Sequence, residues 1–291
     1  MRAYLRAVVA VVVVLALVPS GASAAPKDPI THIVLSSTST PAASQYVSWS
    51  RKKTAKGQKL VVVDGAGKTQ TFAASRKVGI SKKHAGSKRV RYVARAAGLK
   101  ANTSYSYYIR SGKTQSTRGA FRTAGGKGDS FTFLQFGDTQ IKNADVPEDI
   151  IDRARRNHPE ARVMLHAGDV VNHPWVAKEW TELHQALSGS IQHQNWIVSM
   201  GNHEQCVLLK KCRSGSGRGF RSYFHGAANG FKDQRRTWYY VDHGPARIIV
   251  LDSFGKDLAK QRDFLAKALE SNTRQWSIVL MHSGPFASRD D

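Results

Sequence analysis

The sequence lacks a hydrophobic run long enough to cross a membrane. Its longest, Ala7–Val18, has 12 residues, whereas a membrane-spanning helix needs roughly 20. This run follows Arg2 and Arg6 and precedes Ala22-Ser23-Ala24, which is the layout of a secretory signal peptide with its cleavage site. We therefore expect residues 1–24 to be removed, leaving an exported protein without a transmembrane span. An uncleaved membrane anchor is the alternative.

Cysteine is also scarce. The chain has 2 cysteines, Cys206 and Cys212, separated by five residues. In an exported protein such a pair is expected to form one disulfide, which would hold a loop in place. Two free thiols are the alternative.

Acidic residues are few and unevenly distributed. The chain has 21 Asp and Glu against 44 Lys and Arg, and residues 25–124 carry 20 basic but only 2 acidic residues. Such a positive field attracts polyanions; outside a cell these are wall polymers, anionic lipid surfaces or phosphorylated substrates. A merely soluble surface is the alternative. Aromatic residues that could stack on bases do not cluster in this region, so we expect no specific nucleic-acid readout.

Residues 28–124 contain short strand-like runs and no helical pattern. Strands are predicted at 33–35, 46–49, 60–63, 90–93, 105–109 and 120–122. Asp64-Gly65 between two of these runs is typical of a hairpin turn. Regular short strands predict an all-β sandwich, and this region contains no group of catalytic side chains. Residues 123–128 are glycine-rich and are predicted to be a linker.

From residue 129 onward, strands and helices alternate. Strands are predicted at 131–136, 162–165, 196–200, 238–241, 247–251 and 276–281, and helices from near residue 147, at 175–187 and at 257–270. In the last helix, Leu258, Phe264, Leu265 and Leu269 are expected to face inward, and His184 in the second helix is expected on the surface. This alternation predicts an α/β domain with a largely parallel sheet covered on both faces.

Four of these strands end in polar motifs. They are Gly137-Asp138-Thr139-Gln140, His166-Ala167-Gly168-Asp169, Gly201-Asn202-His203-Glu204 and His282. Ligands of α/β sheets bind at the edge where the strands' carboxyl ends meet, and a glycine lets the chain turn sharply there. Two neighbouring carboxylates repel each other unless a cation lies between them. Carboxylate, amide and imidazole ligands together suit Zn, Mn or Fe better than Ca, and a pair of such ions activates water and binds phosphoryl oxygens.

In this order, the motifs resemble those of calcineurin-like metallophosphoesterases. The similarity is closest to purple-acid-phosphatase-like proteins with an N-terminal fibronectin type III-like domain. Leu99 followed by Tyr105 resembles the tyrosine corner of fibronectin type III domains, and Phe121-Arg122-Thr123 resembles the strand that closes them. The resemblance implies a fibronectin-like sandwich at 28–124 and a metallophosphoesterase domain at 129–291.

The resemblance also implies a role for each site residue and two divalent metal ions as cofactors. Asp138 would bind the first ion, Asp169 would bridge both, and Asn202 and His282 would bind the second. His203 would act as general acid for the leaving oxygen or steady the transferring phosphoryl group. Glu204 would orient His203 or its loop, with a plain surface carboxylate as the alternative.

The sequence departs from the family pattern at three places. Gln140 stands where many members have histidine, and its amide oxygen is a weak candidate ligand. Asn172 stands where purple acid phosphatases have tyrosine, so no ferric–tyrosinate centre is expected; Asn172, His166 and His173 are expected to contact substrate or to support the metal ligands. The last family motif, Gly-His-x-His, does not occur. A fragment, a frameshifted product and a depleted first metal site all account for this, and truncation is the expectation we favour.

Two functions are compatible with the sequence. The first is a secreted, metal-dependent phosphoesterase that hydrolyses phosphomonoesters through a metal-bound hydroxide, as acid phosphatases do. It would act outside the cell or at the cell wall on a phosphorylated small molecule or polymer, and diester hydrolysis is a variant of the same chemistry. The second is a catalytically impaired cell-surface protein that holds anionic wall polymers through its basic N-terminal domain.

Overall fold

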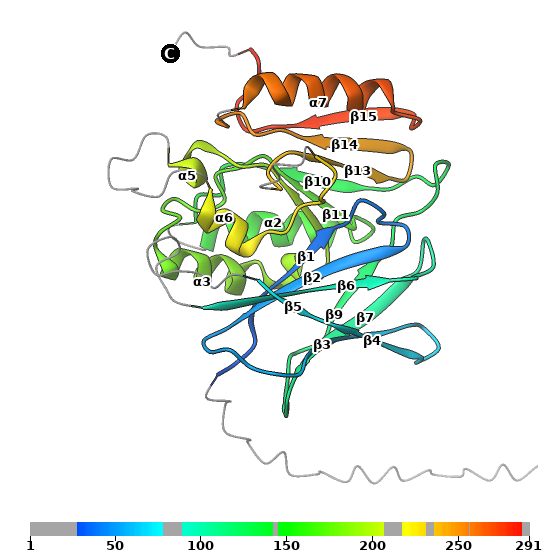
Figure 1. The fold of residues 1–291 in the computed structure, drawn as a ribbon, viewed down its shortest axis with the longest axis vertical. Helices are drawn as coiled ribbons and strands as arrows, with labels where there is room; N and C mark the ends of the chain where they lie inside the picture. The colour runs from blue at the N-terminus through cyan, green and yellow to red at the C-terminus, as the bar shows by residue number, and fades with distance from the viewer. Residues whose placement is uncertain are drawn as a thin grey trace, which may run out of the picture.

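The computed structural model describes residues 28–77, 89–141, 145–206, 217–230, 236–255 and 257–286, and its strands form three sheets (Figure 1). The predicted signal peptide lies outside these residues. Within them, no helix is both long and apolar enough to cross a membrane.

The N-terminal part is a sandwich of two sheets. One layer contains β1 (Thr31–Ser37), β2 (Ser44–Arg51), β6 (Val90–Ala97) and β5 (Ser75–Arg76). The other contains β4 (Thr69–Ala73), β3 (Gln58–Val63), β7 (Ser104–Ser111), β8 (Thr114–Gln115) and β9 (Gly119–Arg122). Trp49, Leu60 and Tyr107 are fully buried between the layers. The predicted β-sandwich is confirmed, and β4, β5 and β8 are strands that the sequence did not reveal.

Two local features of the sandwich were recognisable in the sequence. The Asp64 carboxylate accepts hydrogen bonds from the backbone N–H groups of Ala66 and Lys68 and closes the hairpin between β3 and β4. The Tyr105 hydroxyl accepts a hydrogen bond from the backbone N–H of Lys100 at 3.0 Å, which is the contact expected of a tyrosine corner. Both satisfy backbone groups where the chain reverses direction.

The first sheet of the sandwich continues into the C-terminal part of the chain. There β10 (Phe133–Phe136), β11 (Val163–His166) and β12 (Asn195–Val198) run parallel, and β12 pairs in parallel with β1, placing Trp196 opposite Ser36. One seven-stranded sheet therefore runs in the order β10-β11-β12-β1-β2-β6-β5. The Arg91 side chain on β6 strengthens this junction by donating to the backbone carbonyl of Tyr223 at 2.7 Å.

The parallel strands β10, β11 and β12 are covered on both faces. Four helices pack on one face: α2 (Asp145–Asn157), α3 (Ala177–Ala186), α4 (Ser188–Ile191) and α6 (Arg218–Tyr223). On the other face lies a second sheet of β13 (Tyr239–His243), β14 (Ala246–Val250) and β15 (Trp276–Leu280). Helix α7 (Leu258–Glu270) covers that sheet from outside (Figure 1). The predicted α/β class is confirmed, with the strands divided between two stacked sheets.

Two expectations about the helices were wrong. Phe264 is buried and Leu265 partly buried, as predicted, but Leu258 and Leu269 of α7 are 60% and 44% exposed, because the helix packs through Gln261, Phe264 and Ala268. His184 of α3 is buried rather than on the surface, because the N-terminal strands cover that side of the helix.

Candidate metal centre

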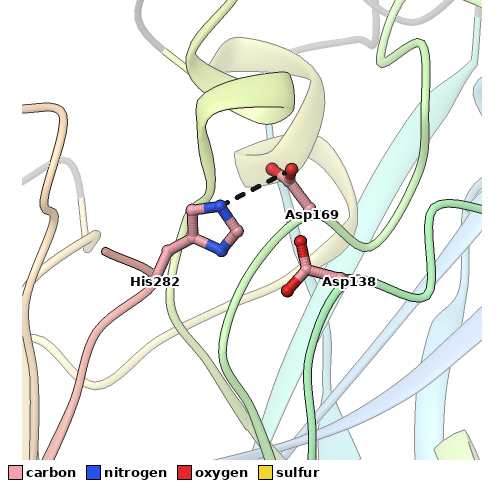
Figure 2. Close-up of side chains that lie close together, drawn as sticks. All are labelled: Asp138, Asp169 and His282. Carbon is pink, nitrogen blue, oxygen red and sulfur yellow. Dashed lines mark ion pairs between the residues drawn. The ribbon is translucent and has the colours of Figure 1, made fainter. Parts of the chain in front are cut away.

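Three of the predicted metal ligands converge beyond the carboxyl ends of β10, β11 and β15. One ligand atom from each of Asp138, Asp169 and His282 lies within 4.8 Å of the other two. Figure 2 shows the two carboxylates side by side, with the imidazole facing Asp169. His282 Nε2 is 3.5 Å from Asp169 Oδ2. Residues more than a hundred positions apart in the chain therefore form one cluster.

The backbone at both carboxylates is strained. Asp138 and Asp169 have φ angles of 52° and 53°, in the left-handed region that costs a residue with a side chain about 1–3 kcal/mol. The two loops hold each other in this conformation: the Asp138 N–H donates to the Gly168 carbonyl at 3.0 Å, and the Gln140 N–H donates to the Asp169 carbonyl at 2.9 Å. Such strain is found mainly at functional sites, where the surrounding structure maintains it.

Glycines allow the second and third motifs to lie directly against each other. A Cβ atom on Gly201 would lie 2.0 Å from Asp169 Oδ1, and one on Gly168 would lie 2.7 Å from the backbone nitrogen of Gly201. Gly168 also has a φ of 95°, which favours glycine. Gly168 is therefore required both for turning and for close approach, and Gly201 for close approach.

Glu204, at the end of the short helix α5 (Asn202–Gln205), fastens these two motifs together. Its side chain is buried, and its two oxygens accept hydrogen bonds from the backbone N–H groups of Asp169, Val170, Val171 and Gly201 at 2.8–3.2 Å. Burial and the nearby Asp169 carboxylate raise its pKa to about 7, while these N–H groups lower it. Glu204 is therefore no surface carboxylate, and it positions the loop that carries Asp169.

The arrangement of Asn202, Asp169 and His282 tests whether a cation fits. His282 Nδ1 lies 2.8 Å from the Ala167 carbonyl, and because a carbonyl only accepts, Nδ1 carries the hydrogen. Nε2 then faces two oxygens, Asn202 Oδ1 at 2.9 Å and Asp169 Oδ2 at 3.5 Å. With a lone pair on Nε2, these three acceptor atoms face one another, and a positive charge between them would remove their mutual repulsion. This donor set fits one divalent ion of the Zn, Mn or Fe type.

A second ion would lie between Asp169 and Asp138. Burial raises the pKa of Asp138, and the Asp169 carboxylate raises it further, while His282 and His203 oppose this. Two carboxylates that compete in this way are stabilised by a shared cation. Gln140 donates from its amide nitrogen to Asp169 Oδ2 at 3.1 Å, so its oxygen is not the atom facing Asp169. Its role as a ligand stays a prediction.

His203 is fixed with one ring nitrogen toward the cluster. Its backbone N–H donates to Asp169 Oδ1 at 2.9 Å, and its Nδ1 donates to the backbone carbonyl of Asn172 at 2.6 Å. Nε2 lies 3.6 Å from Asp169 Oδ2 and is the nitrogen able to exchange a proton with a ligand. Asn172 thus contributes its backbone carbonyl to this contact, and the residue type alone could not predict that.

The other two predicted histidines, His166 and His173, are each held in place by neighbouring residues. His166 is completely buried, stacks on Trp196, accepts from the Gly168 N–H and lies 3.2 Å from the Thr139 hydroxyl. Burial lowers its pKa to about 3. His173 is held by Glu179, whose carboxylate lies 2.7 Å from Nδ1. Sequence reasoning missed Thr139 and Glu179, since their importance arises only from these contacts.

The predicted disulfide stays a prediction. Cys206 directly follows α5 and has a φ of 62°. Cys212 lies outside the described residues.

Comparison with known proteins places both parts of the chain. Residues 131–291 match the family described as calcineurin-like phosphoesterase, and residues 30–123 match the N-terminal domain of purple acid phosphatases. A purple acid phosphatase from Glycine max is 31% identical over 129 residues, covering 41% of this chain and 26% of that protein.

Two solved structures share the fold. A purple acid phosphatase from yellow lupin (Lupinus luteus) seeds superposes with a TM-score of 0.73 at 16% identity, covering 87% of this chain and 50% of that one. A structure of PhoD gives a TM-score of 0.56 at 13% identity, covering 88% and 63%. This chain therefore spans about a quarter of the soybean relative and half of the lupin one.

Proposed function

This chain belongs to the calcineurin-like phosphoesterase family, and from that premise we propose that it is a secreted, metal-dependent phosphoesterase that hydrolyses phosphomonoesters. The observation that carries the proposal is the convergence of Asp138, Asp169 and His282. Asn202 adds an oxygen that faces the same imidazole nitrogen. These residues supply ligands for a divalent cation at the sheet edge where α/β proteins bind substrates.

Each residue of the cluster has a distinct task in this proposal. Asp169 would hold both ions, Asn202 and His282 would hold one of them together with it, and Asp138 would hold the other. A bound metal pair would supply an activated water and positive charge for the phosphoryl oxygens. His203 Nε2 protonates the leaving oxygen, because the opposite nitrogen is already committed to the Asn172 carbonyl. Glu204 and His166 hold the loops that carry Asp138 and Asp169 in position relative to each other.

Hydrolysis of an aryl phosphate monoester with added Mn²⁺ or Zn²⁺ tests the proposal. We expect metal-dependent turnover that Asp169→Asn and His282→Gln reduce by more than about a hundredfold, since ligand-supporting residues alone contribute 10–100-fold. Asp263→Asn is the matched control, because Asp263 lies exposed on α7 and forms a surface ion pair with Arg262. Elemental analysis of the same preparations should show metal lost from the two site variants alone.

The outcomes separate the parts of the proposal. Metal-loaded protein without turnover on any ester would refute catalysis. Faster cleavage of a bis-aryl phosphate than of the monoester would refute monoester specificity. Unchanged rates in Asp169→Asn would refute the site.

A second candidate function follows from the charge distribution. Residues 25–124 carry 20 basic and 2 acidic residues, so the N-terminal sandwich can hold an anionic polymer at the cell surface even if the site is inactive. Retention on immobilised polyphosphate should then fall steeply between low and physiological salt, as screening shortens the range of the field. Retention that is independent of salt would exclude it.

A further inference from the structure

A cavity of about 340 Å³ lies where the N-terminal strands meet α3 and α4. The N-terminal side contributes Thr31 and His32 of β1 and Arg89, which directly precedes β6. The opposite wall contributes His184 and Gln185 of α3, followed by Ser188 of α4. Its volume lies in the range of small-molecule sites, and it shares no residue with the candidate metal centre.

The charge of the cavity favours an anion. None of its lining residues is acidic. The Arg89 guanidinium donates one hydrogen bond, to the Thr31 hydroxyl at 3.0 Å, and no carboxylate in the described part of the chain pairs with it. Its remaining N–H groups are arranged as a planar fork that matches two oxygens of an oxyanion.

One histidine of the cavity, His184, offers an acceptor. His184 Nδ1 lies 2.6 Å from the Trp180 carbonyl and therefore carries the ring hydrogen, which leaves Nε2 with a lone pair. Nε2 is buried and has no hydrogen-bond partner among the residues that the structure describes. Burial is the main cause that lowers the pKa of His184 to about 4, and the positive charges of Arg91 and Arg89 add to it, so the ring is neutral at physiological pH. A buried acceptor without a partner is costly.

His32 forms the neighbouring wall of the cavity. It has a φ of 52° at the point where the pairing of β1 with β2 shifts register, between Thr31 and Val34. Its ring lies edge-on to that of His184, with 4.6 Å between the ring centroids.

From the guanidinium, the buried imidazole nitrogen without a partner and the absence of acids, we propose that this cavity binds inorganic phosphate in its monohydrogen form. Two anionic oxygens accept from Arg89, and the phosphate hydroxyl donates to His184 Nε2 after a small shift of the rings. Hydroxyl and amide groups of Ser188 and Gln185 contact the remaining oxygen. Sulfate has the same shape but carries no hydrogen at neutral pH, so it would leave the imidazole without a donor. The proposal is independent of the proposed hydrolysis.

Calorimetric titration of the full, chelator-treated chain with phosphate and with sulfate at pH 7.5 tests the proposal. Removing metal prevents phosphate from binding through a metal ion at the candidate metal centre. We expect phosphate to bind at least about tenfold more tightly than sulfate, and Arg89→Gln to weaken phosphate binding by about tenfold or more, as expected for loss of a charged hydrogen bond. Arg95→Gln is the matched control, because Arg95 lies on β6 and also donates to a threonine hydroxyl, that of Thr40.

A second variant tests the same cavity in case Arg89→Gln does not fold. Gln185 is exposed on one side and lines the cavity on the other, so Gln185→Glu adds a repelling charge without changing size. Gln275→Glu places the same charge on a distant exposed position and should bind phosphate like the wild type. Equal binding of sulfate and phosphate would overturn the proposal, and so would wild-type phosphate binding by both Arg89→Gln and Gln185→Glu.

Discussion

The substitution Gly201→Ala gives a direct test of how the metal centre is assembled. Gly201 has a φ of −98°, which alanine adopts without strain, so the substitution changes only steric contacts. The added Cβ would lie 2.0 Å from Asp169 Oδ1 and 2.5 Å from the Asp169 backbone nitrogen. That nitrogen is tied to Glu204, so the carboxylate must move.

The required movement can be worked out from these distances. Non-bonded contacts below about 3.0 Å essentially do not occur at Cβ atoms, so Asp169 Oδ1 has to retreat by about 1 Å, against a tolerance of about 0.2 Å for metal–ligand distances. Overpacking of this kind costs about 1–3 kcal/mol. If the metal-free protein relieves the clash by moving Asp169 and the metal-bound protein does not, the same cost lowers the metal affinity by about 5- to 150-fold. The bond from the His203 N–H to Asp169 Oδ1 would be lost as well.

Calorimetric titration of the metal-free protein with Mn²⁺ measures this loss. Gly65→Ala is the matched control, since a Cβ on Gly65 meets nothing within 4 Å, and it should bind Mn²⁺ with wild-type affinity. Wild-type affinity in Gly201→Ala, in a protein that remains folded, would refute the reasoning that close packing of the two motifs sets the position of Asp169.

Three further outcomes follow from the structure. His203→Ala should slow the hydrolysis of an alkyl phosphate by about 10²-fold or more, and that of a p-nitrophenyl ester much less, because only the poor leaving group needs a proton. Glu204→Gln should lower the free energy of unfolding in urea by about 2–4 kcal/mol, because two buried N–H groups lose their acceptor, whereas Glu182→Gln, in a helix-surface pair, should cost under about 0.5 kcal/mol. Burial lowers the pKa of His243 to about 4 from 6.5, so its contribution to stability is present above pH 6.5 and lost as the pH falls toward 4; unfolding of His243→Phe should lack up to about 3 kcal/mol of this acid sensitivity.

The strand-end motifs could be read from the sequence because each is local. A buried strand, a glycine and a polar residue are adjacent in the chain, and the rule that carboxyl ends of parallel strands share an edge brings Asp138, Asp169 and His282 together. The β-sandwich was predictable for the same reason, since each strand alternates on its own. The hairpin at Asp64 and the hydroxyl contact of Tyr105 are equally local.

The contacts that position the site were not predictable in the same way. The four hydrogen bonds of Glu204 join residues 33 to 35 positions away as well as Gly201, and nothing in the sequence distinguishes this carboxylate from an exposed one. His184 is buried because His32 of β1 and Tyr223 of α6 pack against its ring. Leu258 and Leu269 lie on the expected helix, but which face of α7 packs depends on the position of the sheet formed by β13, β14 and β15.

The pairing of β1 with β12 joins the N-terminal sandwich and the C-terminal part of the chain, here called the two halves, in one continuous sheet. Backbone hydrogen bonds run across the junction, and Arg91 adds bonds to the carbonyls of Arg221 and Tyr223. Excising either half at residues 125–128 would leave a bare strand edge that invites pairing with a foreign chain. Any attachment of the basic half to a surface would thus also fix the orientation of the half that carries the candidate metal centre.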